Sequence, residues 1–320
     1  MSGRIRAGWL AAALAVATTA HAQNQLAVQA NAALQAGEAD RALALINALP
    51  PSAEAHNLRC RVQYALERWD PAASECQQAV NMDGQNSDYH LWLGRALGER
   101  ADRASFMSAY SLGKRVRAEF EAAVKANPHN ADALADLGEF YYSAPGIVGG
   151  GDDKAEDVAR QLDQVDPARA HELRARIAEK HKDYGTAERE FKQALTVSAH
   201  PAFQWVTLAA FYGRRGRMAE MESAVESAVK AAQHDKHAGV ALYNGASVLI
   251  KAGRNFELAA KMLEEYLAST AKTDEAPAFV AYTRLARLKA QLGDKAGAQR
   301  AKEAALQLAH DYRPAQDLKF

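Results

Sequence analysis

Small and apolar residues recur along this chain with a period longer than a single helix. In the clearest copy, residues 202–229, they are spaced as on one face of each of two successive helices. These residues are Trp205, Leu208, Ala209, Tyr212, Gly216 and Ala228. No stretch alternates apolar and polar residues for long enough to predict a strand. The pattern therefore predicts antiparallel helix pairs that stack on one another.

The same unit, about 34 residues long, can be followed about seven or eight times. Small residues return where two helices cross most closely, because a larger side chain there would force the helix axes apart. Such positions hold Ala72, Ala79, Gly138, Ala155, Ala187, Ala194, Ala298 and Ala305. Weaker copies lie at residues 25–51 and 239–269. We expect the end copies to be atypical, because a terminal repeat faces water on one side.

These positions resemble the tetratricopeptide repeat (TPR), and the resemblance covers most of the chain. It implies an all-α fold, a right-handed superhelical α-solenoid of about 7–8 helix hairpins over residues 23–320, used for binding rather than catalysis. The composition agrees, with 48% hydrophobic and 24% charged residues and only 9 prolines in 320 residues.

Two segments are longer than the repeat allows, near residues 98–114 and 144–154. We expect the first to lengthen its helices or add a turn. Residues 88–195 resemble an exported bacterial branch of repeat proteins that has an Ala-Pro-Gly turn followed by glycines. The segments HLWLG and FEAAV within it faintly resemble the repeat domain of regulators of microtubule dynamics.

The second insertion contains Gly149, Gly150 and Gly151, followed by Asp152 and Asp153. It lacks the Gly-Lys-Ser/Thr ending of a phosphate loop and the spaced oxygen ligands of a calcium loop. We therefore interpret Asp152 or Asp153 as the cap of a helix that begins near Lys154, with the glycines supplying backbone freedom. Contact with a ligand or a partner is the alternative.

Residues 1–22 have the features of a secretory signal peptide. Arg4 and Arg6 precede an apolar run at residues 7–16, and the segment ends in Ala20-His21-Ala22. We predict cleavage between Ala22 and Gln23, and a periplasmic or secreted protein. An uncleaved anchor is the alternative, but the run is shorter than the about 20 residues of a spanning helix. We expect no stable membrane span in the mature chain.

Export changes the interpretation of the two cysteines, Cys60 and Cys76, which lie on the two helices of one unit. In an oxidising compartment they are candidates for a disulfide. Two buried free thiols are the alternative.

Charge and motifs exclude several classes of function. The formal net charge is zero, which argues against a nucleic-acid partner, since phosphate binding needs a basic face. The pairs His234 with His237 and His171 with His181 lack further ligands at a helical spacing, so we expect no metal and no cofactor. No nucleophile motif is present, and we expect no enzyme.

The candidate site is the concave face of the solenoid, which the first helix of each unit would line. One position on that helix is arginine in four units and glutamate in another, and two tyrosines lie three residues further on. These residues are Arg61, Arg95, Arg176, Arg287, Glu139, Tyr64 and Tyr142. The arginines would suit the carboxylates of an acidic segment or a chain terminus, because the guanidinium group binds them in a bidentate manner. Their pairing with Glu172 and Glu179 on the same helix face is the alternative.

The sequence thus predicts an exported TPR scaffold that binds a protein or peptide partner in the cell envelope, as an adaptor or assembly factor. A scaffold for a lipid or another apolar ligand in the groove is the alternative. Leu91, Phe203 and Val206 would favour it, whereas acidic and basic residues at equivalent positions oppose it. These are Asp88, Asp132, Arg169 and Glu172.

Overall fold

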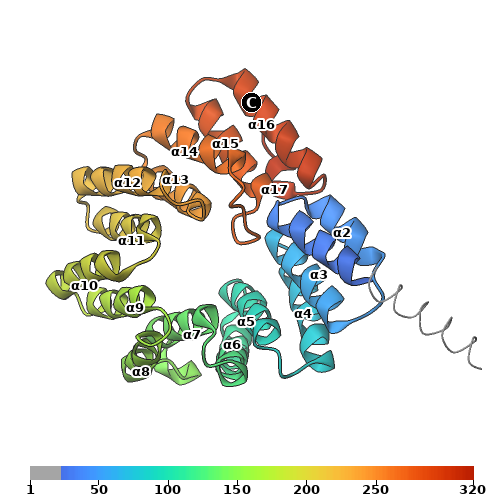
Figure 1. The fold of residues 1–320 in the computed structure, drawn as a ribbon, viewed down its shortest axis with the longest axis vertical. Helices are drawn as coiled ribbons and strands as arrows, with labels where there is room; N and C mark the ends of the chain where they lie inside the picture. The colour runs from blue at the N-terminus through green and yellow to red at the C-terminus, as the bar shows by residue number, and fades with distance from the viewer. Residues whose placement is uncertain (1–22) are drawn as a thin grey trace, which may run out of the picture.

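The computed structural model describes residues 23–320, and all of its regular elements are helical within that range. The helices pair into eight successive hairpins, which confirms the prediction of an all-α solenoid of tetratricopeptide-type hairpins (Figure 1). The predicted signal peptide, including Ala22 on one side of the expected cleavage point, lies outside the described residues. Gln23 is the first residue described.

The first hairpin pairs a helix at residues 23–35 with α2 (Ala39–Asn47). The others are α3 (Ala53–Ala65) with α4 (Trp69–Met82), α5 (Ser87–Asp102) with α6 (Phe106–Ala126), α7 (Ala131–Ser143) with α8 (Asp152–Leu162), α9 (Pro167–Lys180) with α10 (Tyr184–Val197), α11 (Pro201–Arg214) with α12 (Met218–Ala232), α13 (Gly239–Ala252) with α14 (Phe256–Ala268), and α15 (Ala278–Gln291) with α16 (Lys295–Leu308). A 3-10 turn, Gly146–Val148, lies before α8, and the short helix α17 (Arg313–Gln316) follows the last hairpin.

Small residues lie at the helix crossings, as the repeat predicts. Ala72, Ala79, Ala187 and Ala298 are completely buried. At Gly138, an added Cβ would lie 2.4 Å from Cδ2 of Leu173. The close approach of the helices therefore depends on small side chains at these positions.

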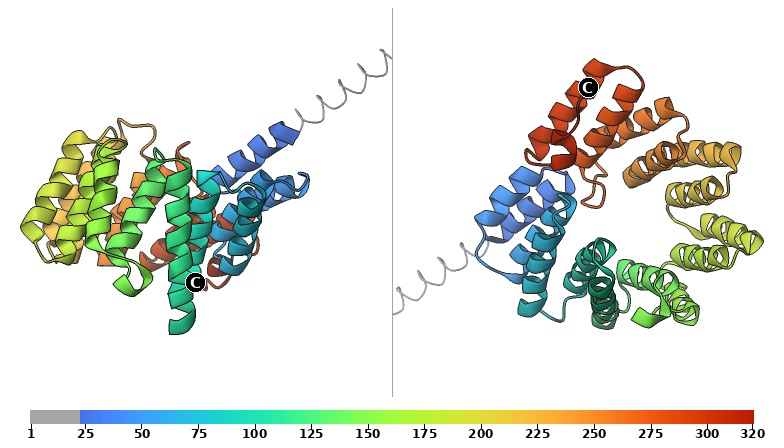
Figure 2. Two further views of the ribbon diagram at one scale, coloured as in Figure 1. Left: turned by 90° about the horizontal axis from the view of Figure 1, so that it is seen from below. Right: turned by 180° about the vertical axis from the view of Figure 1, so that it is seen from behind.

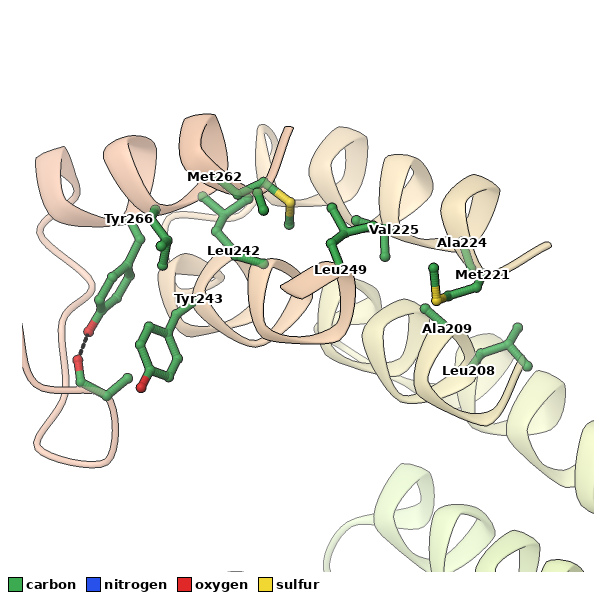
Figure 3. Packing of buried hydrophobic residues seen from close by; sticks show 14 of the residues in the cluster. Leu208, Ala209, Met221, Ala224, Val225, Leu242, Tyr243, Leu249, Met262 and Tyr266 are labelled. Carbon is green, nitrogen blue, oxygen red and sulfur yellow. Dashed lines mark hydrogen bonds between the residues drawn. The ribbon is translucent and has the colours of Figure 1, made fainter. Parts of the chain in front are cut away.

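The interior between the hairpins is filled by larger apolar side chains. In the cluster drawn in Figure 3, Leu208, Met221 and Met262 pack between α11, α12, α13 and α14. Tyr266 at the end of α14 is fully buried, and its hydroxyl donates a hydrogen bond to the carbonyl of Ala276. This bond ties the core to the connection between α14 and α15.

The insertion near residues 98–114 lengthens both helices of its hairpin, as expected. The helices α5 and α6 contain 16 and 21 residues, and α6 projects beyond its neighbours (Figure 2). Phe106 and Met107 begin α6 and are strongly exposed.

The prediction that Asp152 or Asp153 caps its helix is wrong. The helix α8 begins at Asp152, earlier than expected, after Gly151 and without a side-chain cap. Asp152 instead accepts hydrogen bonds from Lys180 Nζ and His181 Nε2 at the end of α9, both at 2.7 Å. Asp152 therefore makes a charge contact with the end of another helix instead of the predicted cap on its own helix.

The glycines before α8 are needed for the turn itself. Gly149 has a φ of 99°, which favours glycine. A Cβ at Gly150 would lie 1.9 Å from the carbonyl oxygen of Ala144.

The two ends of the solenoid pack against each other, so the expectation that the end repeats face water is wrong. The first and last hairpins meet and close the structure into a ring (Figures 1 and 2). One buried apolar cluster joins Ala30, Leu34 and Ile46 to Phe279 and Tyr312. We call this contact between residues 23–68 and residues 274–315 the seam.

Polar contacts accompany the apolar seam. The Tyr312 hydroxyl donates to Glu67 at 2.7 Å, and Arg68 forms an ion pair with Asp311. The backbone N–H of His310 donates to Asp40 at 2.9 Å. The seam therefore joins residues that are more than 240 positions apart in the sequence.

Two glycines of α5 provide a matched test of the helix crossing. A Cβ on Gly94 would lie 2.4 Å from the ring of Phe120 on α6, whereas one on Gly98 has nothing within 4 Å. We expect Gly94→Ala to lower the free energy of unfolding by about 1–3 kcal/mol through overpacking. Gly98→Ala should raise it by about 0.5–1 kcal/mol, because alanine favours a helix. Urea denaturation measures both, and equal effects would contradict the assigned crossing.

Candidate peptide-binding groove

A polar cavity of about 540 Å³ lies on the concave side, next to the seam. The helix at residues 23–35 and helices α3, α5 and α7 contribute to its wall, together with the connection between α14 and α15. Its lining includes Asn31, Glu54, Asn57, Arg61, Asp88, Tyr89, Trp92, Arg95, Asp132, Asp274 and Glu275. Because two predicted arginines line it, we call this cavity the arginine groove.

Arg61 and Arg95 both lie close to the indole ring of Trp92 in the arginine groove. Their guanidinium carbons are 5.4 and 4.8 Å from the centroid of the indole ring. Both side chains are 16% exposed, so little water competes for them. Each is held by carboxylates: Nε of Arg95 donates to Asp136 at 2.6 Å.

The other carboxylates come from the chain itself. Residues 269–277, between α14 and α15, place Asp274 and Glu275 against the two arginines. Arg61 Nε donates to Asp274 at 2.8 Å, and Arg95 Nη1 donates to Glu275 at 2.8 Å. An acidic segment therefore lies where the sequence predicted that one would bind.

Arg176 and Glu139 lie outside the lining of this groove, on α9 and α7. Arg176 pairs with Glu172 at 3.4 Å, as the alternative interpretation of the arginines supposed. Burial raises the pKa of Glu139, and the charge of Arg176 opposes that rise. Burial also raises the pKa of Tyr142, with the charge of Glu139 adding to the effect. Arg176, Glu139 and Tyr142 thus form a separate cluster outside the arginine groove.

Glu179, the second expected partner of Arg176, binds elsewhere. It accepts hydrogen bonds from Nε and Nη2 of Arg214, at 2.9 and 2.7 Å.

Arg287 and Tyr64 also lie outside the lining of the arginine groove. Arg287 lines a cavity of about 1130 Å³ at the seam, with Glu67, Arg68 and Asp311. Tyr64 packs edge-on against Trp69 and Trp92, with ring centroids 5.1 and 5.4 Å away. Burial raises its pKa. Tyr64 thus packs against Trp92 and is not part of the lining of the arginine groove.

Several residues of the groove were not predicted from the sequence, among them Asn57, Trp92, Asp274 and Glu275. Asn57 is 5% exposed, and its Nδ2 is a buried donor with no partner among the described residues. Trp92 and Asn57 lie on the same helices as the predicted arginines, so their position in the repeat was a usable signal. Nothing in the repeat pattern indicated that residues 274–275 reach the groove.

The predicted cysteine pair lies on α3 and α4. Cys60 and Cys76 are completely buried and joined in a disulfide, with 5.2 Å between their Cα atoms. The bond links α3 to α4, so it fixes the helix that carries Asn57 and Arg61.

Among residues 23–320, one group brings three potential metal ligands together: Asp40, His310 and Asp311. Each already has a partner in the seam. Nδ1 of His310 lies 2.9 Å from Asp40, and Asp311 pairs with Arg68, whose positive charge disfavours a cation there. Within the same residues, no helix combines the length and hydropathy needed to cross a membrane.

A second cavity, of about 540 Å³, contains two of the apolar residues that would favour the apolar-ligand alternative. Phe203 and Val206 line it, but so do Arg169, Glu172 and His200. An acyl chain would therefore leave charged groups beside it without water, which is unfavourable.

Two solved structures are similar to this chain in their fold. A thermophilic TPR protein from Thermus thermophilus is 20% identical with a TM-score of 0.48, and the match covers 60% of this chain and 97% of that one. MamA is 13% identical with a TM-score of 0.35, and the match covers 54% of this chain and 93% of that one. No family model and no curated protein matches the chain.

Three hairpins share a histidine–glutamate contact between their two helices. His56, His90 and His171 approach Glu75, Glu119 and Glu190 through Nδ1, at 2.7, 2.6 and 2.7 Å. The hydrogen bond to Glu119 raises the pKa of His90. The charged form of His90 therefore stabilises the folded state.

We expect this contribution of His90 to be complete below the unfolded pKa of about 6.5 and to be lost as the pH rises through the raised pKa. His90→Gln should lower the free energy of unfolding by about 1 kcal/mol near pH 6, and by less as the pH rises. His129→Gln, at an exposed position, is the control. Urea denaturation at a series of pH values from about 6 upwards measures the difference in free energy of unfolding between wild type and His90→Gln. A difference that grew as the pH rose would contradict the assignment.

Proposed function

We propose that this protein is an exported scaffold that binds an extended segment of a protein partner in the arginine groove, as an adaptor or assembly factor of the cell envelope. The observation that carries the proposal is the pair of largely buried arginines beside Trp92, each of which already binds a carboxylate.

The chemistry of the groove suits a peptide. Arginine binds carboxylates in a planar, bidentate geometry, and tryptophan offers a large rigid surface, so both residues often dominate binding energy at interfaces. Nδ2 of Asn57, which has no hydrogen-bond partner within residues 23–320, can donate to a peptide carbonyl. A mixture of donors, acceptors and one aromatic surface recognises a polar chain better than an acyl chain.

Two features support export. Residues 1–22 have the pattern of a secretory signal peptide. The disulfide between Cys60 and Cys76 is a bond typical of oxidising compartments.

Export has a direct test. Protein isolated from the envelope fraction should begin at Gln23, and it should have no titratable thiol when denatured without reductant. N-terminal sequencing by mass spectrometry and a thiol assay measure these. A chain that retains residues 1–22, or two free thiols, would contradict the predicted processing or compartment.

Partner binding is tested by crosslinked affinity capture from the cell envelope, with the mature protein from Gln23 as bait. We expect a reproducible protein partner whose recovery falls at least about tenfold with Arg61→Gln and Arg95→Gln combined, because buried charge pairs at an interface are costly to lose. Arg189→Gln, on the exposed surface of α10, is the matched control.

Mass spectrometry of both proteins and extracted lipids separates the outcomes. A bound lipid without a protein partner would favour the apolar-ligand alternative. Equal recovery with the double variant and the control would exclude the arginine groove as the binding site. Thermal denaturation and small-angle X-ray scattering check that each variant keeps the folded ring.

A further inference from the structure

The connection between α14 and α15 enters the arginine groove. Figure 1 shows this segment, residues 269–277, reaching inside the ring towards α3. It is anchored by the hydrogen bond from the Tyr266 hydroxyl to the carbonyl of Ala276. Its tip carries Thr273, Asp274 and Glu275.

The two carboxylates at the tip bind as a ligand would. Asp274 is only 6% exposed; Oδ2 accepts from Arg61 at 2.8 Å and Oδ1 accepts from Gln35 at 2.9 Å. Glu275, whose side chain is 53% exposed, accepts from Arg95 at 2.8 Å. One carboxylate is thus buried and the next reaches the groove from its rim.

The contact between residues 269–277 and the arginine groove leaves two polar atoms without hydrogen bonds. Nδ2 of Asn57 and Oγ1 of Thr273 are buried without hydrogen-bond partners among the described residues. Buried polar groups are usually paired, and leaving one unpaired is unfavourable. The groove thus keeps one unpaired donor, on Asn57, and the segment keeps one unpaired hydroxyl, on Thr273, so the two surfaces are not fully matched.

We propose that Asp274 and Glu275 are internal competitors for a subsite that recognises two neighbouring carboxylates, and that the partner is an acidic segment presenting such a pair. This inference rests on the proposed function. A neutral or basic segment would displace the pair only by leaving Arg61 and Arg95 buried without these carboxylates. Selectivity for acidic pairs follows from that penalty.

The same displacement affects the seam. Asp274 connects Gln35 of the first hairpin to Arg61 of the second, from a segment that leads into the last. A partner that displaces Asp274 removes this polar link, while the apolar cluster of the seam remains. Binding is thereby coupled to the contacts that close the ring.

The test uses the segment itself as the probe. A fluorescein-labelled peptide of residues 269–277 is titrated with the mature full chain, and its anisotropy is measured at low salt. We expect weak binding to the wild-type protein, because the tethered segment competes at a high effective concentration. Glu275→Gln should bind the peptide several-fold more tightly, and Asp274→Asn with Glu275→Gln at least about tenfold more tightly.

Matched controls isolate the charge pair. Glu226→Gln removes an exposed acid elsewhere, on α12, and should bind as the wild type does. A peptide with asparagine and glutamine in place of the two acids should bind no variant. Glu275→Gln alone decides the matter if the double variant loses its fold, because the Glu275 side chain is half exposed.

Equal affinity of the wild type and Glu275→Gln would overturn the inference, as would equally tight binding of the neutral peptide. If the acidic peptide binds no variant but an envelope partner is captured through the arginines, the inference fails and the proposed function stands. If the peptide binds as expected but no partner is captured, the subsite is real and the proposed function fails.

Discussion

The packing of the first hairpin on the last is the contact on which the rest of this structure depends. In an open solenoid each repeat contacts only its neighbours, so curvature is a sum of small rotations that can vary. Here Leu34 and Ile46 share one buried cluster with Phe279 and Tyr312. This contact between the two ends fixes the total rotation along the chain of repeats. The groove is consequently bounded by residues from both ends of the chain, which only closure brings together.

Closure also constrains which side chains are possible near the seam. Gly37, between the first two helices, has a φ of 75°, and a Cβ there would lie 2.3 Å from the backbone nitrogen of Ala278. The turn of the first hairpin thus touches the start of α15 without room for a side chain. A local feature of one hairpin, a glycine turn, is also a condition for contact with another hairpin far along the chain.

In the arginine groove, each buried arginine is paired with a carboxylate from another part of the chain. Buried arginines are costly unless paired, and the chain supplies acids to Arg61 and Arg95 from α7 and from residues 269–277. The same guanidinium groups lie against Trp92, whose position is supported by Tyr64. The helices thus supply the arginines and one carboxylate of the site, and residues 269–277 supply the other two carboxylates.

The sequence by itself determined the repeated unit: where helices pair, why Ala72 and Ala187 must be small, and which helix face carries Arg61 and Arg95. These features repeat within about 34 residues, so local periodicity records them. Only the tertiary structure decided that the ends meet, that Arg176 and Arg287 lie outside the arginine groove, and that Asp152 binds the end of α9 instead of capping α8. The same holds for Asp274, which acts on a residue 213 positions away. Such contacts depend on the rotation accumulated over many units and on pairs of residues far apart in the chain. The sequence of a single repeat determines neither of these.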